Sequence, residues 1–178
     1  MTVRAYGPAA GFCPRCAASL PGVPPTTCTT CGYALFVNAR PTAGLIVLDG
    51  GRFLALKRAA EPKAGLWETP GGFCAGWEHP ADAAVREARE ELGVEVVLGD
   101  FVGMYVGSYD LQGERLPVLD SFFLAWIGAG TITLDPGESS DMEWFDLDNP
   151  PSLAFATMDA AIRDAARLVD RTGVSRGN

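Results

Sequence analysis

Three glutamates on one predicted helix are the residues best suited to bind a hard metal ion. Glu87, Glu90 and Glu91 stand at i, i+3 and i+4 within Ala81–Val94, so a helix would project all three from one face. Carboxylates crowded in this way repel one another unless a cation lies among their oxygens. Mg²⁺ and Mn²⁺ prefer oxygen ligands of this kind. The spacing therefore indicates either a solvated acidic face or a divalent-metal site.

A glycine loop leads directly into this helix. Pro70-Gly71-Gly72 predicts a tight turn, Pro80 suits a first helical turn, and Gly93 suits the position just after a helix. The predicted apolar face of the helix consists of Ala81, Ala84, Val85, Ala88 and Leu92. The loop and the helix together would hold the three carboxylates beside a backbone turn.

The whole stretch from Gly72 to Val94 follows one fixed spacing, Gly-x5-Glu-x7-Arg-Glu-Ala-x-Glu-Glu-x-Gly-Val. This pattern resembles the Nudix box at every specified position. The resemblance implies an α+β fold, an α/β/α sandwich with a mixed β-sheet. It also implies hydrolysis of a nucleoside diphosphate linked to another group X, by attack of a metal-activated water on one phosphorus of the pyrophosphate.

The resemblance assigns roles to individual residues. One to three Mg²⁺ or Mn²⁺ ions would be held by Glu87, Glu90, Glu91, the Gly71 carbonyl and Glu138. Arg86 would point off the acidic face and orient the box by pairing with Glu78. The general base would be Glu87 or a carboxylate on a loop late in the chain, here called the late loop (Asp135–Asp141). Glu138 is the first candidate on that loop and Asp141 the second.

Four of the five cysteines form two Cys-x-x-Cys pairs, which are Cys13, Cys16, Cys28 and Cys31. Four thiolates at this spacing predict one tetrahedral, structural Zn²⁺ with no open position. The fifth, Cys74, is expected to be a packed side chain rather than a nucleophile. We therefore predict a zinc ribbon over residues 1–38, a Nudix domain over 39–172 and a flexible tail over 173–178.

A zinc ribbon before a Nudix domain resembles the NADH pyrophosphatases and a neighbouring ADP-ribose or FAD pyrophosphatase group. The Ser-Gln-Pro-Trp-Pro-Phe-Pro segment of the NADH enzymes is missing from Gly103–Asp110. ADP-ribose or FAD, cleaved with release of AMP, is therefore the first substrate prediction, and NADH or NAD is the alternative. Two further alternatives are a nucleotide sensor without turnover and a hydrolase of oxidised nucleoside triphosphates.

The residues that would bind the substrate are less clearly marked. Arg58 ends a predicted strand, where it would either contact a phosphate or keep an edge soluble. Tyr109 and Phe155 are candidates to stack on a base or flavin, as are Tyr105 and Phe122, with core packing as the alternative for each. We take Arg58, Tyr109 and Phe155 as the predicted substrate-binding residues.

The overall charge narrows the class of partner. The formal net charge of −8 argues against a nucleic-acid-binding surface. No apolar run reaches the roughly 20 residues that a membrane-spanning helix needs. We expect a cytoplasmic enzyme with a nucleotide-type substrate, and family resemblance suggests a homodimer.

The remaining elements follow from local patterns. Thr42–Leu48 and Phe53–Arg58 predict a hairpin around Asp49-Gly50-Gly51. Two more strands are expected at Val94–Val106, with an interruption at Gly99-Asp100, and at Leu116–Ile127, separated by a loop at Gly107–Gly113. A short strand at Met142–Phe145 and a helix from Ser152 to about Asp170 would complete the domain.

Overall fold

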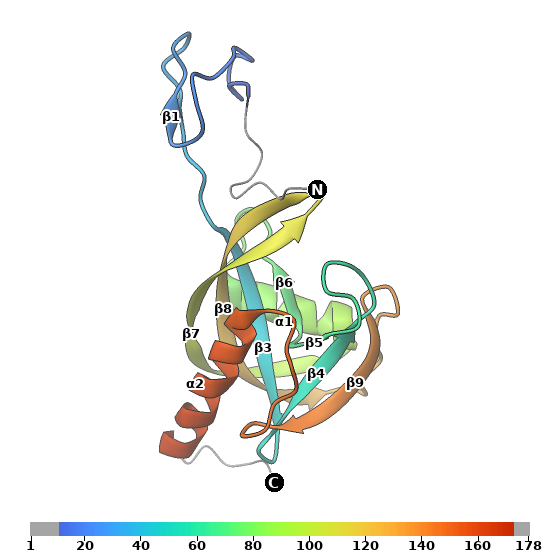
Figure 1. Ribbon diagram of the computed structural model, residues 1–178. Helices are drawn as coiled ribbons and strands as arrows, with labels where there is room; N and C mark the ends of the chain where they lie inside the picture. Colours follow the sequence, from blue (N-terminus) through green and yellow to red (C-terminus); the bar gives the residue numbers. More distant parts are fainter. Residues whose placement is uncertain (1–10, 173–178) are drawn as a thin grey trace. The chain divides into compact units, whose positions relative to one another are not determined.

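The computed structural model describes residues 11–172, so the predicted tail at 173–178 and the first ten residues lie outside the described part. The chain forms two compact units (Figure 1). Of the described residues, one unit contains those up to Arg40 together with Ser108–Pro117, and the other contains Pro41–Gly107 and those from Val118 to Thr172. The predicted division after residue 38 stays a prediction.

Two strands with both faces buried form the centre of the larger unit. Strand β3 runs over Arg40–Asp49 and β4 over Arg52–Arg58. They pair antiparallel with Asp49 opposite Arg52, around a turn in which Gly50 and Gly51 have φ of 61° and 101°. Glycine adopts such angles without a steric penalty, which confirms the predicted hairpin.

The remaining strands extend the sheet on either side of this hairpin. Their order is β5-β4-β3-β8-β7, with β6 paired to β3 and β9 paired to β4. The bounds are Trp67–Glu68 for β5, Gly71–Phe73 for β6, Glu95–Leu111 for β7, Glu114–Ala129 for β8 and Ser139–Asp146 for β9. In the smaller unit, β1 (Thr26–Thr27) pairs with β2 (Ala34–Leu35).

Two helices cover opposite faces of the sheet (Figure 1). Helix α1 spans Pro80–Leu92 and α2 spans Ala156–Thr172. Leu45 and Val47 of β3 pack with the α1 residues, whereas Ile46 and Leu48 pack with the α2 residues. This alternation follows from the two-residue period of a strand. The predicted α/β/α sandwich with a mixed sheet is confirmed.

Three local predictions were wrong. The predicted loop at Gly107–Gly113 is mostly strand, because β7 and β8 continue to a tight turn in which Gln112 and Gly113 have φ of 51° and 82°. Strand β7 is not interrupted at Gly99-Asp100. Helix α2 begins at Ala156 rather than after Ser152, because the Ala154 N–H donates to the Trp67 carbonyl at 2.7 Å and holds this segment against β5.

Neither α1 nor α2 is both long enough and apolar enough to span a membrane. Among the described residues, no helix combines the length and the apolar character that a bilayer crossing requires.

Candidate active site

The glycine loop brings the backbone against β3 and α1 at distances that a side chain would prevent. Gly71 has a φ of 144°, and a Cβ there would lie 2.2 Å from the Ala43 carbonyl oxygen. A Cβ on Gly72 would lie 2.6 Å from Glu87 Oε1. The first glycine therefore lets β6 pair with β3, and the second lets the Glu87 carboxylate approach the loop.

Helix α1 is fixed at both ends. His79 caps it, since the Ala81 N–H donates to His79 Nδ1 at 3.1 Å, and Pro80 is in the first turn as predicted. Gly93 ends the helix with a φ of 66° and donates its N–H to the Arg89 carbonyl. The buried face is Ala83, Ala84, Glu87, Ala88, Glu91 and Leu92. The sequence pattern missed Ala83 and the capping role of His79.

The three box glutamates differ in burial. Glu91 is 6% exposed, and its Oε2 accepts a hydrogen bond of 2.9 Å from the Gly71 N–H. Glu87 is 8% exposed and lies against Gly72. The Glu90 side chain is 55% exposed. Two ligand-type carboxylates therefore point inward against the glycine loop, and the third lies at the solvent edge.

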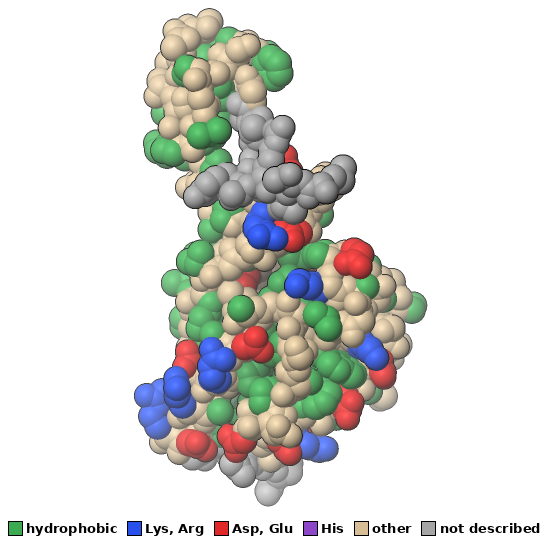
Figure 2. All heavy atoms as spheres, viewed as in Figure 1, with side chains coloured by type: hydrophobic (Ala, Val, Ile, Leu, Met, Phe, Trp, Pro, Cys, Tyr) green, Lys and Arg blue, Asp and Glu red, His purple; other side chains and the backbone are tan. Residues whose placement is uncertain are grey.

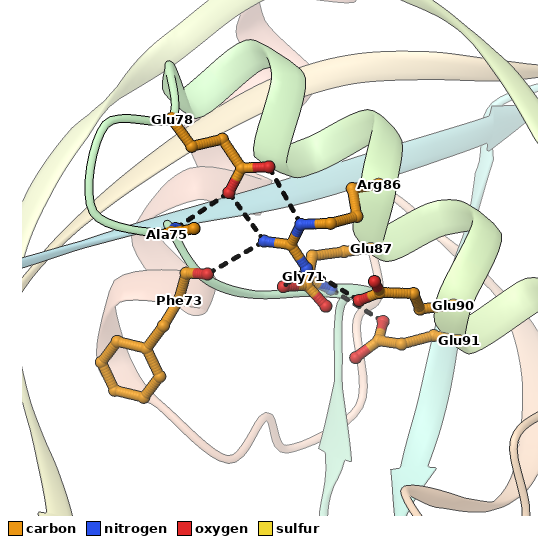
Figure 3. A network of polar contacts seen from close by, with 8 residues as sticks. All are labelled: Gly71, Phe73, Ala75, Glu78, Arg86, Glu87, Glu90 and Glu91. Atoms are coloured by element: carbon orange, nitrogen blue, oxygen red, sulfur yellow. Dashed lines mark hydrogen bonds and ion pairs between the residues drawn. The ribbon is translucent and has the colours of Figure 1, made fainter.

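Arg86 joins these carboxylates to the preceding loop (Figure 3). Its Nε and Nη2 donate to the two oxygens of Glu78 at 2.9 Å each, and Nη2 also donates to the Phe73 carbonyl. Its Nη1 donates to Glu87 Oε1 and Glu90 Oε2, both at 2.7 Å. The expected pair with Glu78 is present. The expectation that Arg86 points off the acidic face was wrong, because its long side chain folds back between the glutamates.

The electrostatics of the cluster show a shortage of positive charge. Burial raises the pKa of Glu91 well above its usual value, and the charges of Glu68, Glu87 and Glu138 raise it further. Burial also raises the pKa of Glu87, although Arg86 opposes this shift. By contrast, hydrogen bonds from Arg86 lower the pKa of Glu78 to about 2. A divalent cation would supply the missing charge at oxygens that suit Mg²⁺ or Mn²⁺.

The late-loop acid Glu138 lies within electrostatic range of the box. Its charge raises the pKa values of Glu68, Glu87 and Glu91. It is exposed, and its backbone carbonyl accepts a hydrogen bond of 2.8 Å from the Ala59 N–H. Asp141 lies further along, in β9, where its Oδ1 accepts from the Met142 N–H. The electrostatic contact of Glu138 with the box is consistent with its place as first candidate, and the choice between Glu138 and Asp141 stays a prediction.

Sequence reasoning missed one carboxylate of this cluster. Glu68, in β5, is 8% exposed and forms an ion pair with Arg58. It lies outside the box spacing, beside a tryptophan in a stretch that reads as a short extended connection. The signal available in the sequence was an acid between a tryptophan and the glycine loop, in a stretch expected to be extended.

Two of the three predicted substrate-binding residues are in contact with each other. The Arg58 guanidinium lies over the Phe155 ring, 5.4 Å from its centroid, and Arg58 Nε donates to the Pro62 carbonyl at 2.7 Å. Tyr109 lies near the β7–β8 turn, in the segment grouped with the cysteine unit. Two of the three residues are therefore brought together, and their assignment to substrate binding stays a prediction.

The alternatives named for other side chains are resolved by packing. Tyr105 packs on Phe122 and donates its O–H to Asp164 Oδ2 at 2.8 Å, so both aromatic rings belong to the core on the α2 side. Cys74 is half-buried against the core on the α1 side. Burial raises the pKa of its thiol. The thiol is therefore a packed side chain with little thiolate character.

The four ribbon cysteines fit a zinc ion. Their sulfur atoms all lie within 4.8 Å of one another. Cys13 Sγ is 3.7 Å from Cys31 Sγ, and Cys16 Sγ is 3.7 Å from Cys28 Sγ. A tetrahedron with Zn–S bonds of about 2.3 Å has edges of about 3.8 Å. The donor set and its spacing therefore match a Cys₄ site.

Comparison with known proteins identifies the family. The NUDIX domain family matches residues 38–166, a range that contains the whole glutamate cluster. The chain belongs to the NUDIX family. It is a Nudix hydrolase, as the names of its relatives also indicate.

Two curated relatives illustrate the range of Nudix activities. The ADP-ribose pyrophosphatase of Methanocaldococcus jannaschii is 31% identical over 124 residues, covering 69% of this chain and 71% of that protein. The NAD-capped RNA hydrolase NudC of Pseudomonas aeruginosa (strain LESB58) is 30% identical over 129 residues, covering 71% of this chain. The chain spans only 43% of that second relative.

A solved structure matches the fold over most of the chain. The NUDIX hydrolase from Nitrosomonas europaea aligns with a TM-score of 0.70 at 21% identity, covering 93% of this chain and 94% of that one. At this identity the likeness supports the fold alone.

Proposed function

We propose that this Nudix hydrolase cleaves the pyrophosphate bond of a nucleoside diphosphate linked to X, with ADP-ribose or FAD as the substrate and AMP as a product. The observation that carries the proposal is the pair of buried carboxylates, Glu87 and Glu91, beside the glycine loop. Two inward acids with raised pKa values are costly in a folded protein unless a cation binds there. A site that concentrates cations suits a polyanionic pyrophosphate.

Bound Mg²⁺ or Mn²⁺ supplies charge neutralisation and a more acidic water. The protein residues have separate tasks in this proposal. Glu87 accepts the proton of the attacking water, and Glu138 is the alternative base. Glu91 is oriented by the Gly71 N–H, which leaves its second oxygen for a metal. Arg86 holds Glu87 and Glu90 together, so it supports the ligands rather than reacting.

The substrate assignment draws on both the sequence and the relatives. The Methanocaldococcus relative is named an ADP-ribose pyrophosphatase, and the match covers most of both chains. The NudC relatives favour an NAD-type substrate as the alternative, but this chain spans less than half of them. The net charge of −8 gives no support to an RNA-bearing substrate. We therefore place ADP-ribose or FAD first.

The Cys₄ site is proposed to hold a structural Zn²⁺, because four thiolates leave no coordination position for substrate or water. We also propose that the enzyme is cytoplasmic, where unpaired thiols are the rule, since all five cysteines are free. A homodimer remains part of the proposal by family likeness.

A substrate panel tests the proposal. The purified protein is incubated with ADP-ribose, FAD, NADH, NAD and diadenosine polyphosphates, each with Mg²⁺ or Mn²⁺, and the products are separated by chromatography. AMP released fastest from ADP-ribose or FAD supports the first assignment, and preference for NADH supports the alternative. Tight nucleotide binding without any hydrolysis over hours would instead indicate a sensor.

A further inference from the structure

Arg58 connects four segments around the glutamate cluster. It is the last residue of β4, and its Nη1 donates to Glu68 of β5. Its Nε donates to the Pro62 carbonyl in the loop that follows β4. Its guanidinium plane lies over Phe155, the residue immediately before α2. The Arg58 and Glu68 side chains are only 12% and 11% exposed, so this ion pair is largely shielded from water.

Strand pairing places Arg58 between the two acids that lie outside the box. On one side, β4 pairs with β5 through Leu56 and Glu68. On the other, Arg58 pairs with Ser139, the neighbour of Glu138, after a register shift between Lys57 and Arg58. The next residue, Ala59, donates its N–H to the Glu138 carbonyl. The Arg58 side chain therefore holds Glu68, whereas the Glu138 loop is held by the backbone that follows β4.

Glu68 is a buried acid within electrostatic range of the box, and its nearest printed contact is the ion pair with Arg58. Its charge acts directly on Glu91, and the Glu138 charge acts on Glu68. A buried carboxylate beside a cation site normally joins the coordination shell or competes for the ion. In this protein Arg58 Nη1 donates to Glu68 Oε2, and the charge-assisted pair occupies that oxygen.

We propose that Arg58 is a positioning residue that pairs with the Glu68 carboxylate and so keeps it from competing for the catalytic cation. The divalent ion is then left to Glu87, Glu90 and Glu91. This inference rests on the proposed hydrolase function, and it replaces the expectation that Arg58 contacts a substrate phosphate. Arg58 acts through the arrangement of carboxylates rather than through contact with the nucleotide.

The test measures Mn²⁺ binding to the substrate-free protein by electron paramagnetic resonance, together with kcat and KM. In Arg58→Met, Glu68 loses its partner and becomes available to the ion, so Mn²⁺ should bind about fivefold or more tightly. In Glu68→Gln, Arg58 keeps its positive charge beside the cluster, so Mn²⁺ should bind about fivefold more weakly. The double variant should return to within about twofold of the parent affinity.

Kinetics separate positioning from phosphate binding. We expect Arg58→Met to lower kcat about tenfold or more with KM changed less than about threefold, because the carboxylates rather than the substrate contacts are disturbed. Arg58→Lys keeps the charge but loses the planar fork, so it should recover part of kcat. A large rise in KM with unchanged kcat would overturn the proposal and restore the phosphate contact.

Arg52→Met is the matched control, because Arg52 begins the same strand and pairs with the exposed Asp49. It should leave the Mn²⁺ affinity unchanged. If Arg58→Met does not fold, the double variant and Arg58→Lys still give an answer, since replacing a buried pair by neutral groups is often tolerated. Equal Mn²⁺ affinity in all folded variants would overturn the proposal. If the parent binds Mn²⁺ but hydrolyses no substrate, the proposed function fails while the affinity comparison still stands.

Discussion

The two metal-type sites of this chain are built on opposite chemical plans. The ribbon has four thiols on two short turns, closed by the Ala17 N–H to the Cys13 carbonyl and the Gly32 N–H to the Cys28 carbonyl. The box has carboxylates on a helix that packs into a sheet. Soft thiolates in a closed set suit a structural ion, whereas hard oxygens with an exposed member suit an exchangeable one.

The surroundings of the two sites differ in the same way. Between Gly11 and Ala39, Arg15 is the one charged residue in the sequence. In the view of Figure 2, the surface of the cysteine-containing segment is mostly green and tan, whereas red and blue side chains are spread over the larger unit. The ribbon therefore has one positive charge, Arg15, with which to steer a polyanion, whereas the box combines several acids with Arg86. This contrast is consistent with the proposal that the box carries out the reaction and that the cysteines hold a structural ion.

Removing a buried box carboxylate should have the largest effect. We expect Glu91→Gln to lower kcat at least about a thousandfold, because it replaces a charged metal ligand by a neutral amide whose single oxygen would be shared between the Gly71 N–H and the ion. Glu87→Gln should be of similar size. Steady-state kinetics at saturating Mn²⁺ provide the measurement. Full activity in either variant would show that the cluster is not the active site.

The adjacent glycines should fail in different ways. In Gly71→Ala the new Cβ would collide with the Ala43 backbone, and the positive φ of this position would be strained for alanine. The substitution should therefore destabilise the protein by about 3 kcal/mol. Gly72→Ala meets only the end of the Glu87 side chain. It should lower kcat about tenfold or more while the denaturation midpoint moves little. Urea unfolding and kinetics on both variants separate the two losses. A stability loss in Gly72→Ala as large as that of Gly71→Ala would contradict this assignment.

Removing a ribbon thiol should affect metal content far more than turnover. We expect Cys28→Ser to lose the bound zinc and to unfold the cysteine unit, because that unit has little apolar material of its own. Hydrolysis by the larger unit should stay within about threefold of the parent. Elemental analysis and kinetics on the same sample provide the test. A collapse of turnover with the larger unit still folded would show that the ribbon takes part in catalysis.

The smallest effect is a pH dependence with a defined sign. Because the pKa values of Glu87 and Glu91 are raised, the native metal-free protein keeps protons that the unfolded chain releases above pH 4.5. Its free energy of unfolding should therefore fall as pH rises through the native pKa values. Mn²⁺ affinity should rise over the same window, since the ion competes with protons. Melting curves recorded over a series of pH values, with chelator and with Mn²⁺, measure how the stability and the Mn²⁺ affinity change with pH. Both pH dependences should be weaker in Glu91→Gln. If Glu91→Gln shows the same pH dependences as the parent protein, Glu91 is not the group that titrates.

The sequence predicted the parts of the site that depend on local spacing. The box glutamates, the helix ends and the glycine loop are all within a short stretch, so their relative positions follow from helical geometry. Glu68 and its partner Arg58 belong to different strands, and their meeting depends on strand pairing that no local pattern encodes. The β7–β8 turn was missed for a related reason, because glycine and polar residues there resemble a loop until the partner strand is known.

The start of α2 shows the same limit. Ser152 is a good capping residue by type, but the following segment is held by a backbone hydrogen bond to Trp67, far away in sequence. Tertiary pairing therefore displaced the helix start to Ala156.

The hydrogen bond from Gly71 to Glu91 has a spectroscopic consequence. Gly71 donates its amide proton to the Glu91 carboxylate, which is nearly inaccessible to water. The resonance of this proton should therefore lie far downfield, and the proton should exchange slowly with solvent. When a cation draws electron density from that carboxylate, the bond weakens and the resonance should move upfield. One amide signal in the backbone would thus report the loading of the site in real time, without labelled substrate or a coupled assay.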